Sequence, residues 1–219
     1  MEKFIVDYRT GADFIGIRIF YDFLEEGLEY AKKNNIKEVC IMTNIDWSKK
    51  VVNFDFLKGM DFIETFHWIV PLSKKSKIEG LYYLYNLKDL RCDIEGINLS
   101  KFKNLEVLNI GHYNNITGWD DLKLLTRLLI GGVESDDLSF LSQVTNLESL
   151  RLIGGKFTTL KGIENCDKLK YITIQGNRNL VHIKETLEQM KGFGNICLER
   201  CKNVNPIEIN LLKEKVFVI

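Results

Sequence analysis

Apolar residues recur along most of the chain in one short pattern: an apolar residue, two variable residues, a second apolar residue, one variable residue and a third apolar residue. Successive clear copies start 18, 20, 22, 22 and 24 residues apart. They are Leu87/Leu90/Cys92, Leu105/Leu108/Ile110, Leu125/Leu128/Ile130, Leu147/Leu150/Leu152, Leu169/Ile172/Ile174 and Phe193/Ile196/Leu198. Alternating apolar and variable positions are typical of a strand with one buried face. The repeat therefore predicts short strands whose apolar residues stack into one core, joined by return segments.

Two copies match each other along their whole length. The return segments after Leu125 and Leu147 also carry regularly spaced apolar residues, which are Leu138, Leu141 and Val144 in the first and Phe157, Leu160, Ile163 and Cys166 in the second. With this period and strand motif, the chain resembles the leucine-rich repeat family, of the short bacterial kind with internalin-like spacing. The resemblance implies an α/β fold, a right-handed solenoid with a curved parallel β-sheet. The family's turn asparagine appears as Asn177, and Cys201 is its permitted substitute, whereas Val133 and Gly155 take that place elsewhere.

Weaker copies of the pattern extend it in both directions. Upstream they are Ile36/Val39/Ile41, followed by Asn44 at the place of the turn asparagine, and Ile63/Phe66/Trp68. Downstream, Val216 and Val218 fit a last strand. In all, the pattern predicts nine or so strands. We expect the repeat solenoid to cover residues 36–219.

The first 35 residues are expected to form an N-terminal cap that belongs to the same structural unit. Alternating residues on either side of Thr10–Gly11 predict a β-hairpin. The segment 22–35 carries apolar residues at helical spacing, with Asp22 as the expected N-cap and Glu25 completing a capping box.

The last two return segments are expected to be helical. In the first, Leu180, Ile183, Leu187 and Met190 share one helical face. In the second, Asn205 is the expected N-cap and Pro206 takes the first helical position.

Strand residues that alternate with the core residues face away from the core and line the concave surface of the sheet. A soluble strand can carry any polar residue there, so a solvated face is the simplest interpretation. The mixture of side chains nevertheless resembles the centre of a protein interface, because guanidinium groups lie among aliphatic and aromatic side chains. The predicted partner-binding residues are Arg91, Arg127, Arg151, Tyr171, Leu129, Val107 and Ile153. Cys40 and His67 also alternate with core residues and are expected on this concave surface.

The sequence closes with "KEKVFVI", which places Phe217 and Ile219 on the concave side of the expected last strand. An uncovered strand presents unpaired N–H and C=O groups. We therefore expect this edge to pair with its equivalent in a homodimer or to accept a strand from a partner. The alternative is a short strand shielded by the charged residues before it.

Composition limits the partners. The 219 residues are 45% hydrophobic, with 30 basic and 30 acidic side chains, so nucleic acid and membrane surfaces are poor candidates. Neither a signal peptide nor a membrane span is expected, and we predict a cytoplasmic protein. Five cysteines, an odd number, suit reduced thiols.

The sequence offers little catalytic chemistry. Its three histidines, His67, His112 and His182, form no metal-ligand motif, and Cys197 and Cys201 have no second pair to complete a zinc site. Phosphate-loop and nucleophile-elbow patterns are absent. We expect no cofactor and no metal.

The prediction is therefore a non-catalytic module that recognises a protein partner on its concave face. A bacterial immunity or inhibitor protein for a specific toxin or enzyme is a narrower version. A self-assembling structural protein is the other alternative. An enzyme is disfavoured because the repeats occupy nearly all of the sequence.

Overall fold

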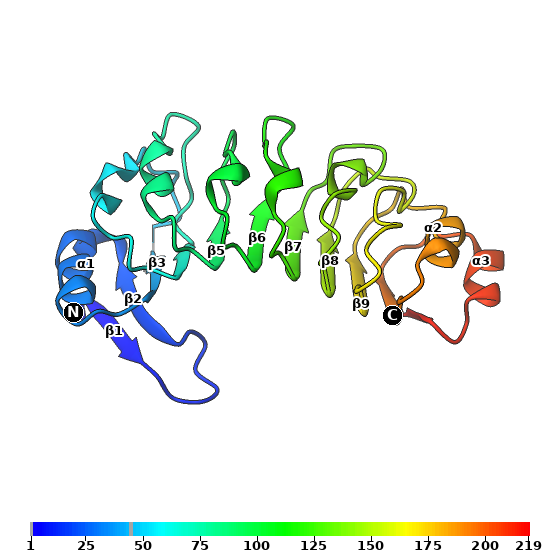
Figure 1. Ribbon diagram of the computed structural model, residues 1–219, viewed down its shortest axis with the longest axis horizontal. Helices are drawn as coiled ribbons and strands as arrows, with labels where there is room; N and C mark the ends of the chain where they lie inside the picture. The colour runs from blue at the N-terminus through cyan, green and yellow to red at the C-terminus, as the bar shows by residue number, and fades with distance from the viewer. Residues whose placement is uncertain (1, 44–45) are drawn as a thin grey trace. The chain divides into compact units, whose positions relative to one another are not determined.

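The computed structural model describes residues 2–43 and 46–219 (Figure 1). The chain divides into two compact units. Unit 1 comprises Met1–Ile94 and Lys101–Leu105, and unit 2 comprises Glu95–Ser100 and Glu106–Ile219. Asn44, which the sequence places at a turn-asparagine position, lies outside the described residues.

Unit 1 begins with an antiparallel hairpin and continues as parallel strands in sequence order. Its strands are β1 (Phe4–Asp7), β2 (Gly16–Phe20), β3 (Glu38–Met42), β4 (Thr65–Trp68) and β5 (Asp89–Cys92). β1 pairs antiparallel with β2, and β2, β3, β4 and β5 pair in parallel. Helix α1 (Leu24–Lys33) and the 3-10 turns η1 (Tyr21–Phe23), η2 (Phe54–Leu57) and η3 (Glu79–Tyr83) make up the connecting segments.

Unit 2 repeats one arrangement, in which each strand is followed by a return segment and a parallel strand. Its strands are β6 (Val107–Gly111), β7 (Arg127–Gly131), β8 (Ser149–Ile153), β9 (Tyr171–Gln175), β10 (Asn195–Glu199) and β11 (Val216–Val218). They pair in parallel in this order. The returns hold η5 (Trp119–Asp121), η6 (Ser139–Leu141), α2 (Lys184–Gln189) and α3 (Pro206–Leu211), while η4 (Leu99–Lys101) contains residues of both units.

The repeated apolar residues form the core, as the pattern predicted. From Leu87 to Leu198, every residue of the six clear motifs is at most 5% exposed. The predicted return positions, from Leu138 to Cys166, are fully buried as well. Strands β3 to β11 follow the nine predicted motifs. Burying apolar side chains in successive turns is the main force that holds such repeats together, since no single turn encloses a core of its own.

The turn positions of the repeat are satisfied in different ways. The buried Asn177 donates from Nδ2 to the carbonyl of Phe157 at 2.9 Å, and its Oδ1 accepts from the backbone N–H of Asn179 at 2.7 Å. Cys201 replaces it in the next turn, with Sγ 3.5 Å from the carbonyl of Ile174. Gly155 takes the same place with φ +119°, a conformation that disfavours any side chain.

The N-terminal elements form as expected, except for the helix cap. The hairpin is present, and α1 buries Leu28 and Ala31. The predicted capping box is wrong, because Asp22 lies inside η1 and the N-cap of α1 is Phe23, which makes no side-chain capping bond. The 3-10 turn before the helix shifts the start of α1 beyond the reach of Asp22.

The C-terminal returns are helical, as predicted. Asn205 caps α3 by accepting from the N–H of Ile207 at 2.9 Å, and Pro206 is the first residue of the helix. Helix α2 is shorter than the apolar pattern indicated, since it begins at Lys184. Val218 was expected in the core but is 59% exposed, in the last of the described strands, which pairs with β10.

Candidate protein-binding surface

The strand register in unit 2 aligns its outward-facing residues in three rows. The first row is Val107, Arg127, Ser149, Tyr171 and Asn195. The second is Asn109, Leu129, Arg151, Thr173, Cys197 and Phe217. The third is Gly111, Gly131, Ile153, Gln175 and Glu199. The rows match those predicted from sequence, and together they are called the unit 2 face below.

Six of the predicted binding residues share this face. Arg127, Arg151 and Ile153 are exposed, Val107 and Leu129 are half-buried, and Tyr171 is 57% exposed. Val107 lies directly opposite Arg127, and Leu129 lies directly opposite Arg151. Parallel strands lie about 4.8 Å apart, so each arginine stem lies beside an aliphatic side chain.

The two arginines of the unit 2 face differ in their contacts. Arg151 donates from Nε and Nη2 to Oε1 of Gln175, at 2.9 and 2.6 Å. Gln175 in turn donates from Nε2 to Glu199. Among the described residues, no ion pair or hydrogen bond involves the guanidinium of Arg127. Arg151 is therefore held in place, whereas Arg127 is free to bind a carboxylate of a partner.

Sequence reasoning missed the roles of Gln175 and Glu199. Both alternate with the core residues of their strands and therefore face outward, but neither is among the binding residues predicted from sequence. Their positions could have indicated the contact. Arg151 lies opposite Thr173 on the next strand, and Gln175 is two residues further along that strand. Such diagonal neighbours are within reach of long side chains.

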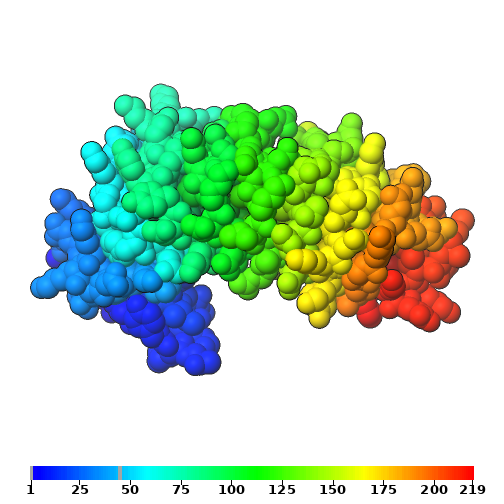
Figure 2. Space-filling model, viewed as in Figure 1, coloured from blue at the N-terminus to red at the C-terminus, as the bar shows by residue number. Residues whose placement is uncertain are grey.

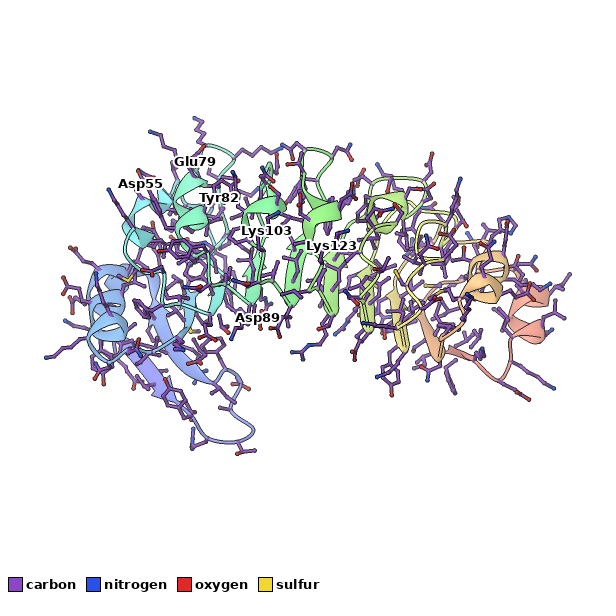
Figure 3. All side chains as sticks on the ribbon, viewed as in Figure 1. Asp55, Glu79, Tyr82, Asp89, Lys103 and Lys123 are labelled. Atoms are coloured by element: carbon purple, nitrogen blue, oxygen red, sulfur yellow. The ribbon has the colours of Figure 1, made fainter. Side chains whose placement is uncertain are left out.

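Arg91, the seventh predicted residue, belongs to unit 1. It is exposed on β5, directly opposite His67 of β4. His67 was expected on the surface, and its Nε2 lies 3.0 Å from Oδ1 of Asp89. Figure 3 shows Asp89 on the side of unit 1 opposite to Asp55, Glu79 and Tyr82, which belong to return segments.

Cys40 was predicted to face away from the core, on the concave surface of the sheet. It lies on the outward row of unit 1, opposite both Arg18 and His67, yet it is only 2% exposed. Burial raises the pKa of its thiol to about 11, against the opposing effect of the nearby Arg91 and Arg18 charges. Burial likewise raises the pKa of Cys166 to about 11. These thiols are protonated at neutral pH, and a protonated thiol is a poor nucleophile.

Two further observations concern metal binding and membranes. Within residues 2–43 and 46–219, no group of three or more His, Cys, Asp or Glu side chains is arranged to hold a metal ion. In the same ranges, no helix has the length and apolar character needed to span a bilayer.

The C-terminal end of unit 2 exposes several large apolar side chains. β11 pairs with β10 on one side, and Phe217, Val218 and Ile219 are all more than half exposed. On α3, Ile207 and Leu211 are exposed and lie one helical turn apart. In Figure 2 these residues belong to the red end of unit 2. They are called the C-terminal apolar end below.

Comparison with known proteins gives one line of evidence on the fold. Neither protein-family sequence models nor curated protein sequences match the chain. Among solved structures, the crystal structure of internalin C2 from Listeria monocytogenes is similar, with a TM-score of 0.55 and 20% identity. The match covers 74% of this chain and 68% of that one. The chain therefore has a leucine-rich repeat fold of the internalin type, as its repeat pattern predicted.

Proposed function

We propose that this protein is a non-catalytic interaction module that binds a protein partner on its unit 2 face. The observation that carries the proposal is the gathering of Arg127, Arg151, Leu129, Ile153 and Tyr171 on adjacent strands. Arginine and tyrosine are enriched where protein interfaces concentrate their binding energy, and the surrounding aliphatic side chains exclude water. A leucine-rich repeat fold supports such a role in general, because its strands present an extended surface.

The partner should carry at least one carboxylate beside apolar side chains. The free guanidinium of Arg127 can take a bidentate carboxylate. Arg151 is already oriented by Gln175, so it loses little side-chain entropy on binding. Ile153 and Tyr171 supply apolar area on either side.

Alanine substitution tests this surface. Arg127→Ala or Tyr171→Ala should raise the dissociation constant for the partner roughly 30-fold or more, which corresponds to ~2 kcal/mol at an interface centre. The partner is first captured from a native lysate and identified by mass spectrometry, and its affinity is then measured by calorimetry. The melting temperature should stay unchanged, since both side chains are exposed.

Two exposed residues outside the unit 2 face provide matched controls. Arg178→Ala and Tyr85→Ala remove the same side-chain types from loop positions and should leave the affinity within twofold of the wild type. Wild-type affinity in both Arg127→Ala and Tyr171→Ala would reject the proposed surface. If the partner is an enzyme or toxin whose activity falls in the complex, the narrower inhibitor function applies.

Self-assembly is a second candidate function, favoured by the C-terminal apolar end. Among the described residues β11 pairs only with β10, and its other side can pair with β11 of a second copy, burying Phe217 and its neighbours. Multi-angle light scattering across a dilution series should then show a dimer at high concentration, and Phe217→Lys should abolish it. A monomer at every concentration for the wild type would eliminate this function.

A further inference from the structure

The loop that joins β1 to β2, residues 8–15, lies against the outward face of unit 1. Its Phe14 ring is 5.1 Å from the ring of His67 on β4, at an angle of 59°. Its Asp13 carboxylate is 3.8 Å from Nη1 of Arg18. Gly16 has φ +126° where the loop enters β2, and a Cβ there would lie 2.4 Å from the carbonyl oxygen of Glu38. Figure 1 shows the hairpin extending from the rest of unit 1.

The loop lies over part of a row of outward side chains, in which Arg18 and His67 are half-buried and Arg91 is exposed. Arg18, Cys40, His67 and Arg91 lie opposite one another on β2 to β5. Cys40 is almost completely buried, whereas Cys197, in the second outward row of unit 2, is only half-buried. Phe14 of the loop packs on His67, which lies directly opposite Cys40.

The loop contacts β2 and β4 through side chains, Asp13 with Arg18 and Phe14 with His67. Within the loop, the N–H of Ala12 donates to the carbonyl of Arg9 at 3.1 Å. The guanidinium of Arg9 donates to the carboxylate of Asp7, at the end of β1. Among the described residues, no backbone hydrogen bond joins residues 8–15 to β3, β4 or β5. The Asp13 side chain is almost fully exposed despite its ion pair with Arg18. Segments with few buried contacts and exposed ion pairs open at low free-energy cost.

The loop leaves part of the covered row unsatisfied. Nε of Arg18 is buried and has no hydrogen-bond partner among the described residues. Buried donors in proteins are nearly always paired, because an unpaired donor loses its bonds to water. A carboxylate that approached the other edge of the Arg18 guanidinium, away from Asp13, could pair with Nε and Nη2 together.

We propose that Arg18, Cys40, His67 and Arg91 form a peptide-binding site on unit 1, and that Asp13–Phe14 occupies it in the free protein. The chemistry of this occupant defines the ligand as an extended segment of a protein partner in which an acidic residue is followed by an aromatic residue. The partner's aromatic ring takes the place of Phe14 on His67, and its carboxylate binds Arg18. The loop competes with the partner and lowers its apparent affinity.

The accessibility of Cys40 tests whether the loop covers the site. The protein is treated with N-ethylmaleimide under native conditions, and the labelling rate of each cysteine is followed by mass spectrometry. Phe14→Ala should raise the rate at Cys40 at least tenfold. Cys92, which is 1% exposed in the core of the same unit, should stay unlabelled and so report an intact fold.

An unchanged rate at Cys40 in Phe14→Ala would overturn the proposal. If Cys92 also reacts, the substitution has unfolded unit 1, and the milder Asp13→Asn variant decides instead. That variant keeps the aromatic ring and should raise the rate at Cys40 at least threefold. An unchanged rate there would equally overturn the proposal.

Binding of a peptide tests the chemistry of the ligand. The probe is a fluorescent peptide with the sequence of residues 8–16, YRTGADFIG, followed by fluorescence anisotropy. A chain carrying Asp13→Ala and Phe14→Ala should bind it at least tenfold more tightly than the wild type, whose own loop competes. A control peptide with alanine in place of both residues should not bind. Equal affinity of the two chains, or equal binding of the two peptides, would contradict the proposed site.

Discussion

Leu150→Ala should lower the free energy of unfolding by about 2–5 kcal/mol, the range for a buried leucine whose cavity does not collapse. Leu150 is 1% exposed in the middle of β8, and its neighbours in the register are Leu128 and Ile172. All three side chains point into the core of unit 2, so the truncation leaves a void between two adjacent turns. Chemical denaturation followed by circular dichroism measures the change.

Leu124→Ala is the matched control for this prediction. The same substitution is made in the same unit, but Leu124 is 49% exposed and lies in a return segment. Its effect should stay below about 1 kcal/mol, as for most surface substitutions. Equal effects of the two substitutions would mean that the assignment of buried strand positions is wrong.

Gly162→Ala should destabilise the protein by about 2–4 kcal/mol, through overpacking and backbone strain together. Gly162 has φ +112°, and a Cβ there would lie 2.3 Å from the carbonyl carbon and oxygen of Leu138. Both obstacles are backbone atoms of the preceding turn, which cannot move without separating two repeats. The same denaturation experiment measures the effect.

Gly176→Ala separates the two contributions. Gly176 also has a positive φ, +68°, but a Cβ there meets no atom within 4 Å. Only the conformational cost remains, so we expect a loss of about 1 kcal/mol. If Gly162→Ala costs no more than Gly176→Ala, the close contact between the turns at Leu138 is absent.

The repeat made most of this fold predictable from sequence. Each turn depends on a few apolar side chains at fixed spacing, such as Leu147, Leu150 and Leu152. The position of each strand can therefore be predicted from its local sequence, without knowledge of distant segments. The same periodicity fixed which strand residues point outward, so the register of Arg127, Leu129 and Tyr171 was recoverable as well. Side chains in a strand alternate between its two faces. Once the apolar residues are assigned to the core, the residues between them must point outward.

The remaining features depend on contacts that periodicity does not encode. Periodicity assigned Cys40 to the outward face, but the residue is only 2% exposed, beside a His67 ring on which Phe14 of a distant loop packs. The bond from Arg151 to Gln175 depends on the rotamers of two long side chains. Asp22 had the right residue type for an N-cap, but the preceding 3-10 turn moved the start of the helix. Each of these features depends on side-chain contacts or local backbone geometry that the apolar repeat does not specify.

Hydroxyl-radical footprinting of the protein, free and bound to its partner, tests the proposed function most directly. The method reports the solvent exposure of individual side chains and needs no substitution. Tyr171 lies on the unit 2 face and Tyr85 lies on a loop of unit 1, and both are exposed in the free protein. Binding of the partner should suppress oxidation of Tyr171, Leu129 and Ile153 and leave Tyr85 unchanged. Unchanged oxidation of Tyr171 in a saturated complex would contradict the proposed function.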